Sequence, residues 1–291
     1  MAADGILNVH KPRGPTSFQV VRHVRRLTGE RRVGHGGTLD PLAEGVLPVL
    51  LGRATRLSRY LMDLPKAYRV EGRLGQATDT YDAEGVVTLE GDPSGITLEE
   101  LRDALASFEG VIQQVPPPYS AVKVGGRPAY ARARSGEAPR LAPRAVQVYR
   151  LTLLEYRPPV FVMEVECGRG TYVRSLVHDL GLKLGCGAHV LRLVRLRVGP
   201  FALEEAVPPE RLPQEWRERL LPPDAALAHL PSVQLDEAQA QAMRHGRPLA
   251  LPSGPTASQR LRAYDAAGNL LGVLRKEATG DLWRPETVLA S

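Results

Sequence analysis

One glycine-rich segment holds the carboxylate that is best placed to do chemistry. Residues 34–45 read Gly-His-Gly-Gly-Thr-Leu-Asp-Pro-Leu-Ala-Glu-Gly. Glycines allow positive φ angles and close approach of a ligand, and Asp40 precedes a proline, which favours extended or turn backbone. An isolated Asp-Pro pair is most often a plain turn. Here His35, further glycines and a following apolar strand share the segment, so we expect Asp40 to project from a loop that forms part of a site.

Two further clusters could contribute to that site. Residues 11–17 read Lys-Pro-Arg-Gly-Pro-Thr-Ser, which predicts a turn leading into a capped helix. Residues 168–175 read Gly-Arg-Gly-Thr-Tyr-Val-Arg-Ser and open a second helix. Tyr172 and Arg174 are two positions apart and point to different sides of that helix, so one can pack while the other pairs with a carboxylate. The alternative for Arg174 is a surface salt bridge.

Other kinds of chemistry find no support in the sequence. The seven histidines include no His-x-x-x-His pair, and two cysteines, Cys167 and Cys186, are too few for a thiolate cage, so we expect no metal. The glycine-rich segment lacks the Gly-Lys-Ser/Thr ending of a P-loop, and the chain has no Gly-x-Ser-x-Gly elbow of a hydrolase. A lone carboxylate with arginine and aromatic neighbours must therefore carry any reaction.

The composition indicates a globular protein without a membrane segment. The chain has 291 residues, of which 43% are hydrophobic and 24% charged. No apolar run is long enough to span a bilayer. Residues 1–5 lack the pattern of a secretory signal. We therefore expect a cytoplasmic protein.

The net charge of +6 is unevenly distributed along the chain. Bases outnumber acids ten to four in residues 1–60, seven to one in 123–150 and six to one in 168–200, whereas residues 79–109 hold nine acids and one base. Three basic blocks that converge on one face would bind a polyanion. On the charge distribution alone, ordinary solvent-exposed surfaces are as good an explanation of these blocks as a polyanion-binding face.

The elements that must position these clusters follow from hydrophobic periodicity and capping signals. We predict strands at 5–10, 46–51, 68–74, 120–124, 145–156, 160–167, 190–198, 260–265 and 270–275. We predict helices at 17–28, 54–62, 97–108, 172–184 and 236–244. The mixture lacks a regular βαβ alternation, which favours an α+β fold. A proline-rich stretch at 207–231 indicates a linker and divides the chain into domains at 1–230 and 231–291, the second small and β-rich.

The clusters also match a known family when they are taken together. The chain contains, in order, Lys-Pro-x-Gly-x-Thr-Ser, Gly-His-x-Gly-x-Leu-Asp-Pro-x-Ala-x-Gly-x-Leu-Pro, Gly-Thr-Tyr-Val-Arg-Ser-Leu and Gly-Cys-Gly-Ala-His-Val. Three shorter matches, at 66–70, 74–80 and 117–123, fit in the same order. Residues 5–200 thus resemble the TruB family of tRNA pseudouridine synthases, which act on uridine 55 of the T-loop. Residues 232–291 resemble the small PUA-like RNA-binding domain of its bacterial members.

The resemblance implies an isomerase with the pseudouridine-synthase fold, in which a mixed, largely antiparallel central sheet is flanked by helices. The reaction breaks the N1–C1′ glycosidic bond of uridine, turns the base and rejoins it through C5, so it needs no cofactor. Asp40 matches the essential aspartate, and Arg174 is the arginine opposite it, which would hold the carboxylate ionised. Tyr68 would stack on the target base and could take the C5 proton. Whether Asp40 attacks C1′, attacks C6 or removes the C2′ proton stays open.

The same resemblance assigns the residues that would bind the substrate. Tyr172 would contact the target base from another side, and Leu193 would close the pocket. His35 would fill the space that the flipped base leaves in the loop, although a buried histidine bonded to a carbonyl is the simpler interpretation. Lys11 completes the set. We expect the three basic blocks to line one face with Asp40 at its floor.

The expected partner is tRNA, bound through its T-arm at the elbow, by a monomer with no obligate protein partner. One alternative within the class is an RNA-guided pseudouridine synthase, but the chain has no added arm or basic tail for partner docking. A second alternative is a tRNA-folding chaperone without catalysis, against which Asp40, Tyr68 and Arg174 argue. A third is a nucleosidase that breaks the same bond and releases the base.

Overall fold

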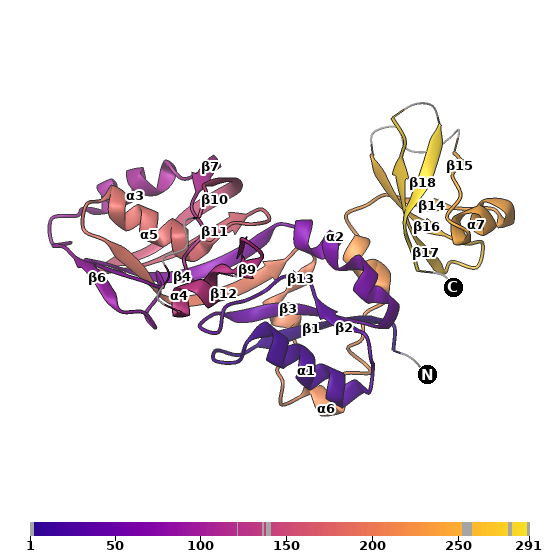
Figure 1. Cartoon of the computed structure of the whole chain (residues 1–291), viewed down its shortest axis with the longest axis horizontal. Helices are drawn as coiled ribbons and strands as arrows, with labels where there is room; N and C mark the ends of the chain where they lie inside the picture. Colours follow the sequence, from indigo (N-terminus) through magenta and orange to yellow (C-terminus); the bar gives the residue numbers. More distant parts are fainter. Residues whose placement is uncertain are drawn as a thin grey trace.

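Two β-sheets organise the protein (Figure 1). The structure is a computed structural model that describes residues 3–120, 122–135, 137, 141–251, 258–278 and 281–289. The larger sheet has the order β1-β3-β12-β4-β11-β10-β7, with β2 paired to β3 and β13 to β12. Its strands are β1 (Gly5–Lys11), β2 (Val33–His35), β3 (Glu44–Leu51), β4 (Lys66–Leu74), β7 (Gly110–Gln114), β10 (Arg144–Arg157), β11 (Val160–Cys167), β12 (Ala188–Val198) and β13 (Phe201–Ala202).

The second sheet lies in the C-terminal part and has the order β14-β16-β17-β18-β15. Its elements are β14 (Ser232–Gln234), α7 (Glu237–Arg244), β15 (Leu249–Ala250), β16 (Arg260–Tyr264), β17 (Leu270–Lys276) and β18 (Leu282–Val288). Two small hairpins are formed by β5 (Gln76–Thr78) with β6 (Val87–Glu90), and by β8 (Lys123–Val124) with β9 (Arg127–Pro128). The other helices are α1 (Ser17–Thr28), η1 (Gly52–Leu57), α2 (Ser58–Asp63), α3 (Leu98–Ala106), α4 (Ala129–Arg134), α5 (Val173–Lys183), η2 (Leu203–Glu205), α6 (Leu212–Glu215) and η3 (Pro223–Leu227).

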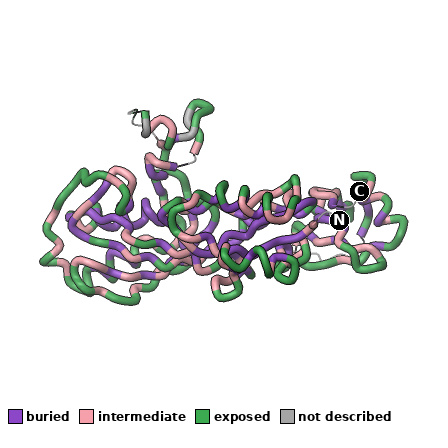
Figure 2. Tube along the Cα trace, turned by 90° about the horizontal axis from the view of Figure 1, so that it is seen from below, coloured by how far each residue is buried: buried purple, intermediate pink, exposed green. Residues whose placement is uncertain are grey.

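The larger sheet is mixed but largely antiparallel, as predicted. The β12–β3 pair is parallel, whereas β1–β3, β12–β4, β4–β11, β11–β10 and β10–β7 are antiparallel. Alternate residues of β11, from Phe161 to Cys167, are buried because successive side chains of a strand point to opposite faces. The apolar stripe of α5 packs on that face together with α3. This layer fixes where α5, and therefore Arg174, lies relative to the sheet. Figure 2 shows that the buried segments run through the middle of the molecule, between exposed loops.

A second layer supports the segment around Asp40. Helix α1 begins at Thr16, which forms the predicted cap through a capping box with Gln19. Its buried face, Val20 to Val24, packs against β1, β3 and α6. The turn and capped helix predicted for residues 11–17 are therefore present, and they lie directly beside the segment that carries Asp40.

The C-terminal sheet contacts the part of the chain that holds the larger sheet through the cationic segment η1–α2. The guanidinium groups of Arg53 and Arg56 donate to the carbonyl oxygens of Leu289 and Val288. The hydroxyl of Tyr60 donates to the carboxylate of Glu286 at 3.0 Å. Three arginines of the first basic block, Arg53, Arg56 and Arg59, thus contact the end of β18 and are still exposed. The expectation that the three basic blocks line one face with Asp40 at its floor stays a prediction.

Most predicted elements are present within a few residues of their expected ends. The helix expected at 54–62 is divided into η1 and α2, and the segment 33–45 is not all turn because β2 occupies Val33–His35. The strand expected at 120–124 shrinks to the two residues of β8, with residue 121 outside the described part. Periodicity missed several edge and hairpin strands, β6, β7, β14, β15 and β18. No helix in the described part of the chain is long and apolar enough to cross a membrane.

Candidate active site

Asp40 projects from the loop that connects β2 to β3, as the glycines and the proline predict. Gly37 and Gly45 adopt positive φ angles of 135° and 111°. The hydroxyl of Ser17 donates to the carbonyl oxygen of Leu39 at 3.0 Å and accepts from its N–H at 2.8 Å. These two bonds tie the residue before Asp40 to the first turn of α1, so the carboxylate is held by a rigid element.

A buried arginine braces the other side of this loop. Arg195 of β12 is 1% exposed, and its guanidinium donates to the carbonyl oxygens of Gly37, Thr38 and Val46. The sequence interpretation overlooked this residue. The available signal was its position two residues after Leu193 on an alternating strand, which places a charged side chain on the buried face.

Lys11 also holds the loop from inside the protein. Its side chain is fully buried, and its ammonium donates to the carbonyl oxygens of Pro12 at 2.9 Å and Ala43 at 2.6 Å, and more weakly to that of Pro41. Burial lowers the pKa of Lys11 to about 8, while the charge of Asp40 opposes this shift. Lys11 lines neither of the cavities described below, so the structure separates it from the other expected binding residues.

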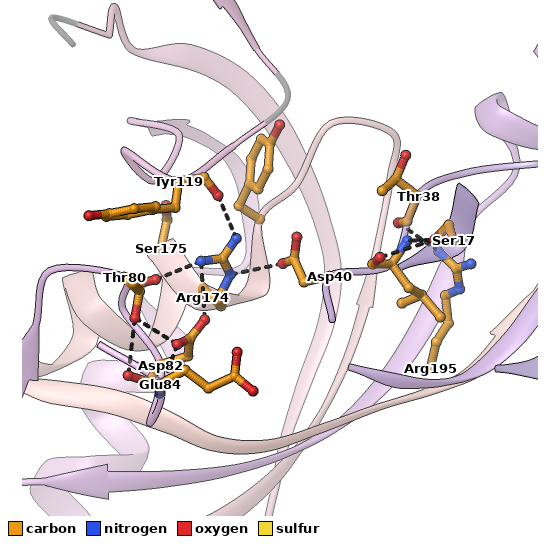
Figure 3. Close-up of polar contacts among 12 residues, drawn as sticks. Ser17, Thr38, Asp40, Thr80, Asp82, Glu84, Tyr119, Arg174, Ser175 and Arg195 are labelled. Atoms are coloured by element: carbon orange, nitrogen blue, oxygen red, sulfur yellow. Dashed lines mark hydrogen bonds and ion pairs between the residues drawn. The ribbon is translucent and has the colours of Figure 1, made fainter. Parts of the chain in front are cut away.

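Arg174 lies between two carboxylates at the start of α5 (Figure 3). Its Nε donates to Oδ2 of Asp40 at 2.9 Å, and its NH1 donates to Oδ2 of Asp82 at 3.2 Å. The carbonyl oxygens of Thr80 and Tyr119 accept from the same guanidinium at 2.6 and 2.9 Å. The side chain of Arg174 is 4% exposed, whereas that of Asp40 is 33% exposed. This is a buried network and not the alternative surface salt bridge.

The second carboxylate, Asp82, was not found from the sequence. Its side chain is 7% exposed. Its Oδ1 accepts from the hydroxyl of Thr80 at 2.6 Å and from the N–H of Glu84 at 3.1 Å, which is a local turn geometry that any Asp in such a segment can adopt. Nothing in that local pattern indicates that the same side chain reaches Arg174, 92 residues away.

A cavity of about 310 Å³ opens beside Asp40 and collects five of the seven expected site residues. Its lining includes Asp40, Tyr68, Tyr172, Arg174 and Leu193. Burial raises the pKa of the Tyr68 phenol and that of the Tyr172 phenol, so both side chains are neutral at pH 7. The cavity therefore offers one carboxylate, two flat aromatic side chains and an apolar wall, which suits a planar heterocycle attached to a sugar.

A larger cavity of about 600 Å³ lies on the other side of Asp40 and contains His35. The Nδ1 of His35 accepts from the N–H of Gly37 at 3.2 Å, which leaves the ring proton on Nε2. Burial and the charge of Arg195 lower the pKa of His35 below its usual 6.5. His35 is thus a neutral ring bonded to a backbone N–H, not to a carbonyl. In the described part of the chain, no three His, Cys, Asp or Glu side chains are grouped as metal ligands would be.

Sequence comparison finds three adjoining family matches. Residues 25–173 match the TruB family pseudouridylate synthase N-terminal domain. Residues 174–229 match the tRNA pseudouridylate synthase B C-terminal domain, and residues 230–290 match the tRNA pseudouridine synthase II C-terminal domain.

Relatives from distant bacteria are similar over most of the chain. A protein of Symbiobacterium thermophilum named tRNA pseudouridine synthase B is 50% identical over 246 residues, which cover 84% of this chain and 82% of the relative. Proteins of the same name from Pseudomonas aeruginosa and Dehalococcoides mccartyi are 44% and 42% identical and cover 92% and 98% of this chain, and 90% and 96% of their own lengths.

Solved structures point to the same class. The chain superposes on one in a structure titled "Crystal Structure of a Cbf5-Nop10-Gar1 Complex" with a TM-score of 0.76 at 30% identity, covering 98% of this chain and 84% of that one. The fold and the site therefore define an isomerase of the pseudouridine synthase class. Within that class the chain belongs to the TruB family.

Proposed function

We propose that this protein converts uridine 55 in the T-loop of tRNA to pseudouridine. The observation that carries the proposal is the single partly exposed carboxylate, Asp40, which is held by the buried Arg174 at the edge of a cavity with two tyrosines. The relatives that are 42 to 50% identical are named for the modification of tRNA, which supports the substrate class.

Asp40 is the group that starts the reaction. Arg174 is a permanent cation and pairs with Asp40 through its Nε at 2.9 Å. Oδ2 of Asp40 accepts from Nε of Arg174, and Oδ1 faces the substrate. The N1–C1′ bond breaks, the C5–C1′ bond forms, and the proton that leaves C5 balances the proton that N1 gains. The carboxylate can attack C1′, attack C6 or remove the C2′ proton, and all three routes use the same position of Asp40.

The other residues of the smaller cavity hold the base during the reaction. We assign Tyr68 to stacking on the uracil, because its buried phenol is neutral and begins the reaction with its own proton. Tyr68 can therefore accept the proton from C5 only if its own phenolic proton is first passed to another acceptor. Tyr172 contacts the base from a second side, and Leu193 closes the pocket.

Access to Asp40 requires the target nucleotide to leave the folded loop, which costs a few kcal/mol of unstacking. His35 lies across Asp40 from the base pocket, in the larger cavity. A neutral imidazole is flat and can stack where bases were, so we assign His35 to the space that the flipped nucleotide leaves. Lys11 supports this arrangement indirectly, through the loop that carries Asp40.

The remaining assignments concern the protein as a whole. We propose that residues 1–230 form the catalytic domain and that residues 231–291 form a PUA-like domain that binds RNA. We further propose a cytoplasmic monomer that binds the T-arm at the tRNA elbow and uses neither a cofactor nor an obligate protein partner.

Tritium release from 5-tritiated uridine in unmodified tRNA tests the proposal. The wild-type protein should release one tritium per tRNA and leave pseudouridine at position 55, and Asp40→Asn should abolish release. Asp63→Asn serves as the matched control, because Asp63 is a half-exposed carboxylate near the same cavity that pairs with Arg169. Release that survives in Asp40→Asn would refute the role of Asp40. Free uracil as the product would identify a nucleosidase. If the wild-type protein forms no product, the tRNA-folding chaperone is the remaining interpretation.

The nearest alternative within the class is an RNA-guided pseudouridine synthase. The same assay decides it: activity of the purified protein on tRNA, with no other protein or guide RNA present, excludes a guide requirement.

A further inference from the structure

The outer face of α1 carries an unusual row of side chains. Phe18, Arg22, Arg25 and Arg26 recur at the i, i+4, i+7 and i+8 positions of one helical face, opposite the buried valines. All four are exposed, and Phe18, at 66%, is among the most exposed large hydrophobic residues of the described chain. The row extends over about 12 Å, because a helix rises about 1.5 Å per residue.

The row begins at the active site. Phe18 lines the larger cavity together with Asp40 and His35. The preceding residue, Ser17, is bonded to Leu39 of the catalytic loop. Figure 1 shows α1 on the outside of β1 and β3. At the far end the chain leaves α1 and adds two more exposed arginines, Arg31 and Arg32, before it enters β2.

The charge of this surface is not compensated within the described part of the protein. Glu30 is the one acid in residues 5–39. We call the arginines of the row and the two that follow it the α1 arginines: Arg22, Arg25, Arg26, Arg31 and Arg32. No acid in the described part of the chain forms an ion pair with any of them. Most other arginines of the described chain differ, since Arg69, Arg192 and Arg197, for example, pair with glutamates on the sheet. Arg25 donates to the carbonyl oxygen of Arg31, but none of the five cations has an acidic partner in the described part of the chain. Such a set favours a polyanionic ligand.

We propose that the outer face of α1 binds the backbone of the substrate RNA as it leaves the active site, with Phe18 stacked on an unpaired base next to the target nucleotide and the α1 arginines on successive phosphates. This proposal rests on the proposed function, because it extends the same RNA from the cavity over the surface. Arginine suits this role since its fork of donors matches a phosphate. An aromatic ring suits an unpaired base, because every base has a face on which it can stack.

The experiment measures binding of unmodified tRNA as a function of KCl concentration. The test variant is Arg22→Gln/Arg25→Gln/Arg26→Gln. The matched control is Arg73→Gln/Arg102→Gln/Lys183→Gln. The control removes the same charge from exposed residues that lie elsewhere on the protein and form no ion pairs. Each lost phosphate contact lowers the slope of log K against log salt by about 0.7 to 0.9. The test variant should therefore lower the slope by about 2 to 3 and raise KM, with kcat at saturating tRNA unchanged. The control should keep the wild-type slope.

Phe18 is tested separately. Phe18→Leu keeps an apolar side chain but removes the flat face, and it should weaken tRNA binding about tenfold. Phe18→Trp should restore it. Equal slopes for the arginine variant and its control would overturn the phosphate track, and wild-type affinity of Phe18→Leu would overturn the stacking contact. Failure of the proposed function is distinguishable, because then the wild-type protein itself would form no pseudouridine.

Discussion

Replacing Asp82 with Asn tests whether the second carboxylate positions Arg174 for catalysis. The substitution keeps the shape of the side chain and its hydrogen-bond acceptor but removes the charge that lies 3.2 Å from NH1 of Arg174. Two unit charges at that distance attract by about 5 kcal/mol at an effective dielectric constant of 20. Most of this attraction offsets the cost of burying the carboxylate. We therefore expect a net loss of about 1 to 3 kcal/mol in the free energy of unfolding.

The effect on catalysis should be larger than the effect on stability. Without Asp82, the guanidinium is drawn towards Asp40 alone, and a displacement of about 1 Å at a reacting group can cost about 100-fold in rate. We expect kcat to fall about 100-fold in the tritium-release assay, with KM for tRNA nearly unchanged.

Asp40→Asn provides the comparison, because Asp40 is the more exposed partner of Arg174. Its removal should abolish activity but cost less than about 1 kcal/mol, since Asp82, Thr80 and Tyr119 still satisfy Arg174. Both free energies are measured by urea unfolding. A wild-type kcat for Asp82→Asn, or an equal destabilisation by the two substitutions, would show that the reasoning about this network is wrong.

Three other perturbations follow from the loop that carries Asp40. Gly45→Ala would place a Cβ against the carbonyl oxygen of Arg195 at a φ of +111°. We therefore expect a loss of more than about 3 kcal/mol in the free energy of unfolding, measured in urea, and of most activity. Gly95→Ala, with open space around the new Cβ, should be tolerated. Burial lowers the pKa of Lys11 in the folded protein to about 8. Above that pH the folded protein releases a proton that the unfolded chain keeps. The contribution of Lys11 to the free energy of unfolding therefore rises between pH 8 and 9.5. Over the same pH range Lys11 loses the ammonium charge that holds the loop of Asp40, so kcat should fall while the contribution of Lys11 to Tm rises. A kcat that stays constant to pH 9.5 contradicts the role of Lys11 in holding the loop. His35 has a lowered pKa and is neutral at pH 7, so His35→Gln should raise KM for tRNA about tenfold but leave the acid side of the pH–kcat profile unmoved. A shift of that limb in the variant would show that His35 titrates during catalysis.

Elements with a strong local signal could be predicted from the sequence. The helix at Ser17–Thr28 has a capping box, an apolar stripe and a terminal glycine, and the structure reproduces all three. The strands β4, β11 and β12 alternate clearly and lie where periodicity puts them. By contrast, β18 lies in the small C-terminal sheet and contains Pro285 and charged residues, so its strand conformation depends on pairing with β17.

The residues of the candidate site also differ in whether a local sequence signal marks them. Asp40 could be selected because glycines, a proline and a neighbouring strand mark its loop, and the family motifs supplied Tyr68, Tyr172, Arg174 and Leu193, which the fold brings to one cavity. Arg195 and Asp82 carry no comparable local mark. Both act through contacts with residues that are more than 90 positions away in the chain.

The sequence by itself determined the family, the α+β class and the loop that carries the proposed reactive carboxylate, Asp40, because these depend on residue order and local backbone preference. The tertiary structure decided how that carboxylate is held: Arg174 lies between two acids, Lys11 and Arg195 support the loop from inside, and part of the positive charge binds the C-terminal sheet. The physical reason is that burial sets the strength of a charge, and burial is a property of the packed chain. A basic residue looks the same in the sequence whether it is in a core, at a domain contact or on a surface that can meet RNA.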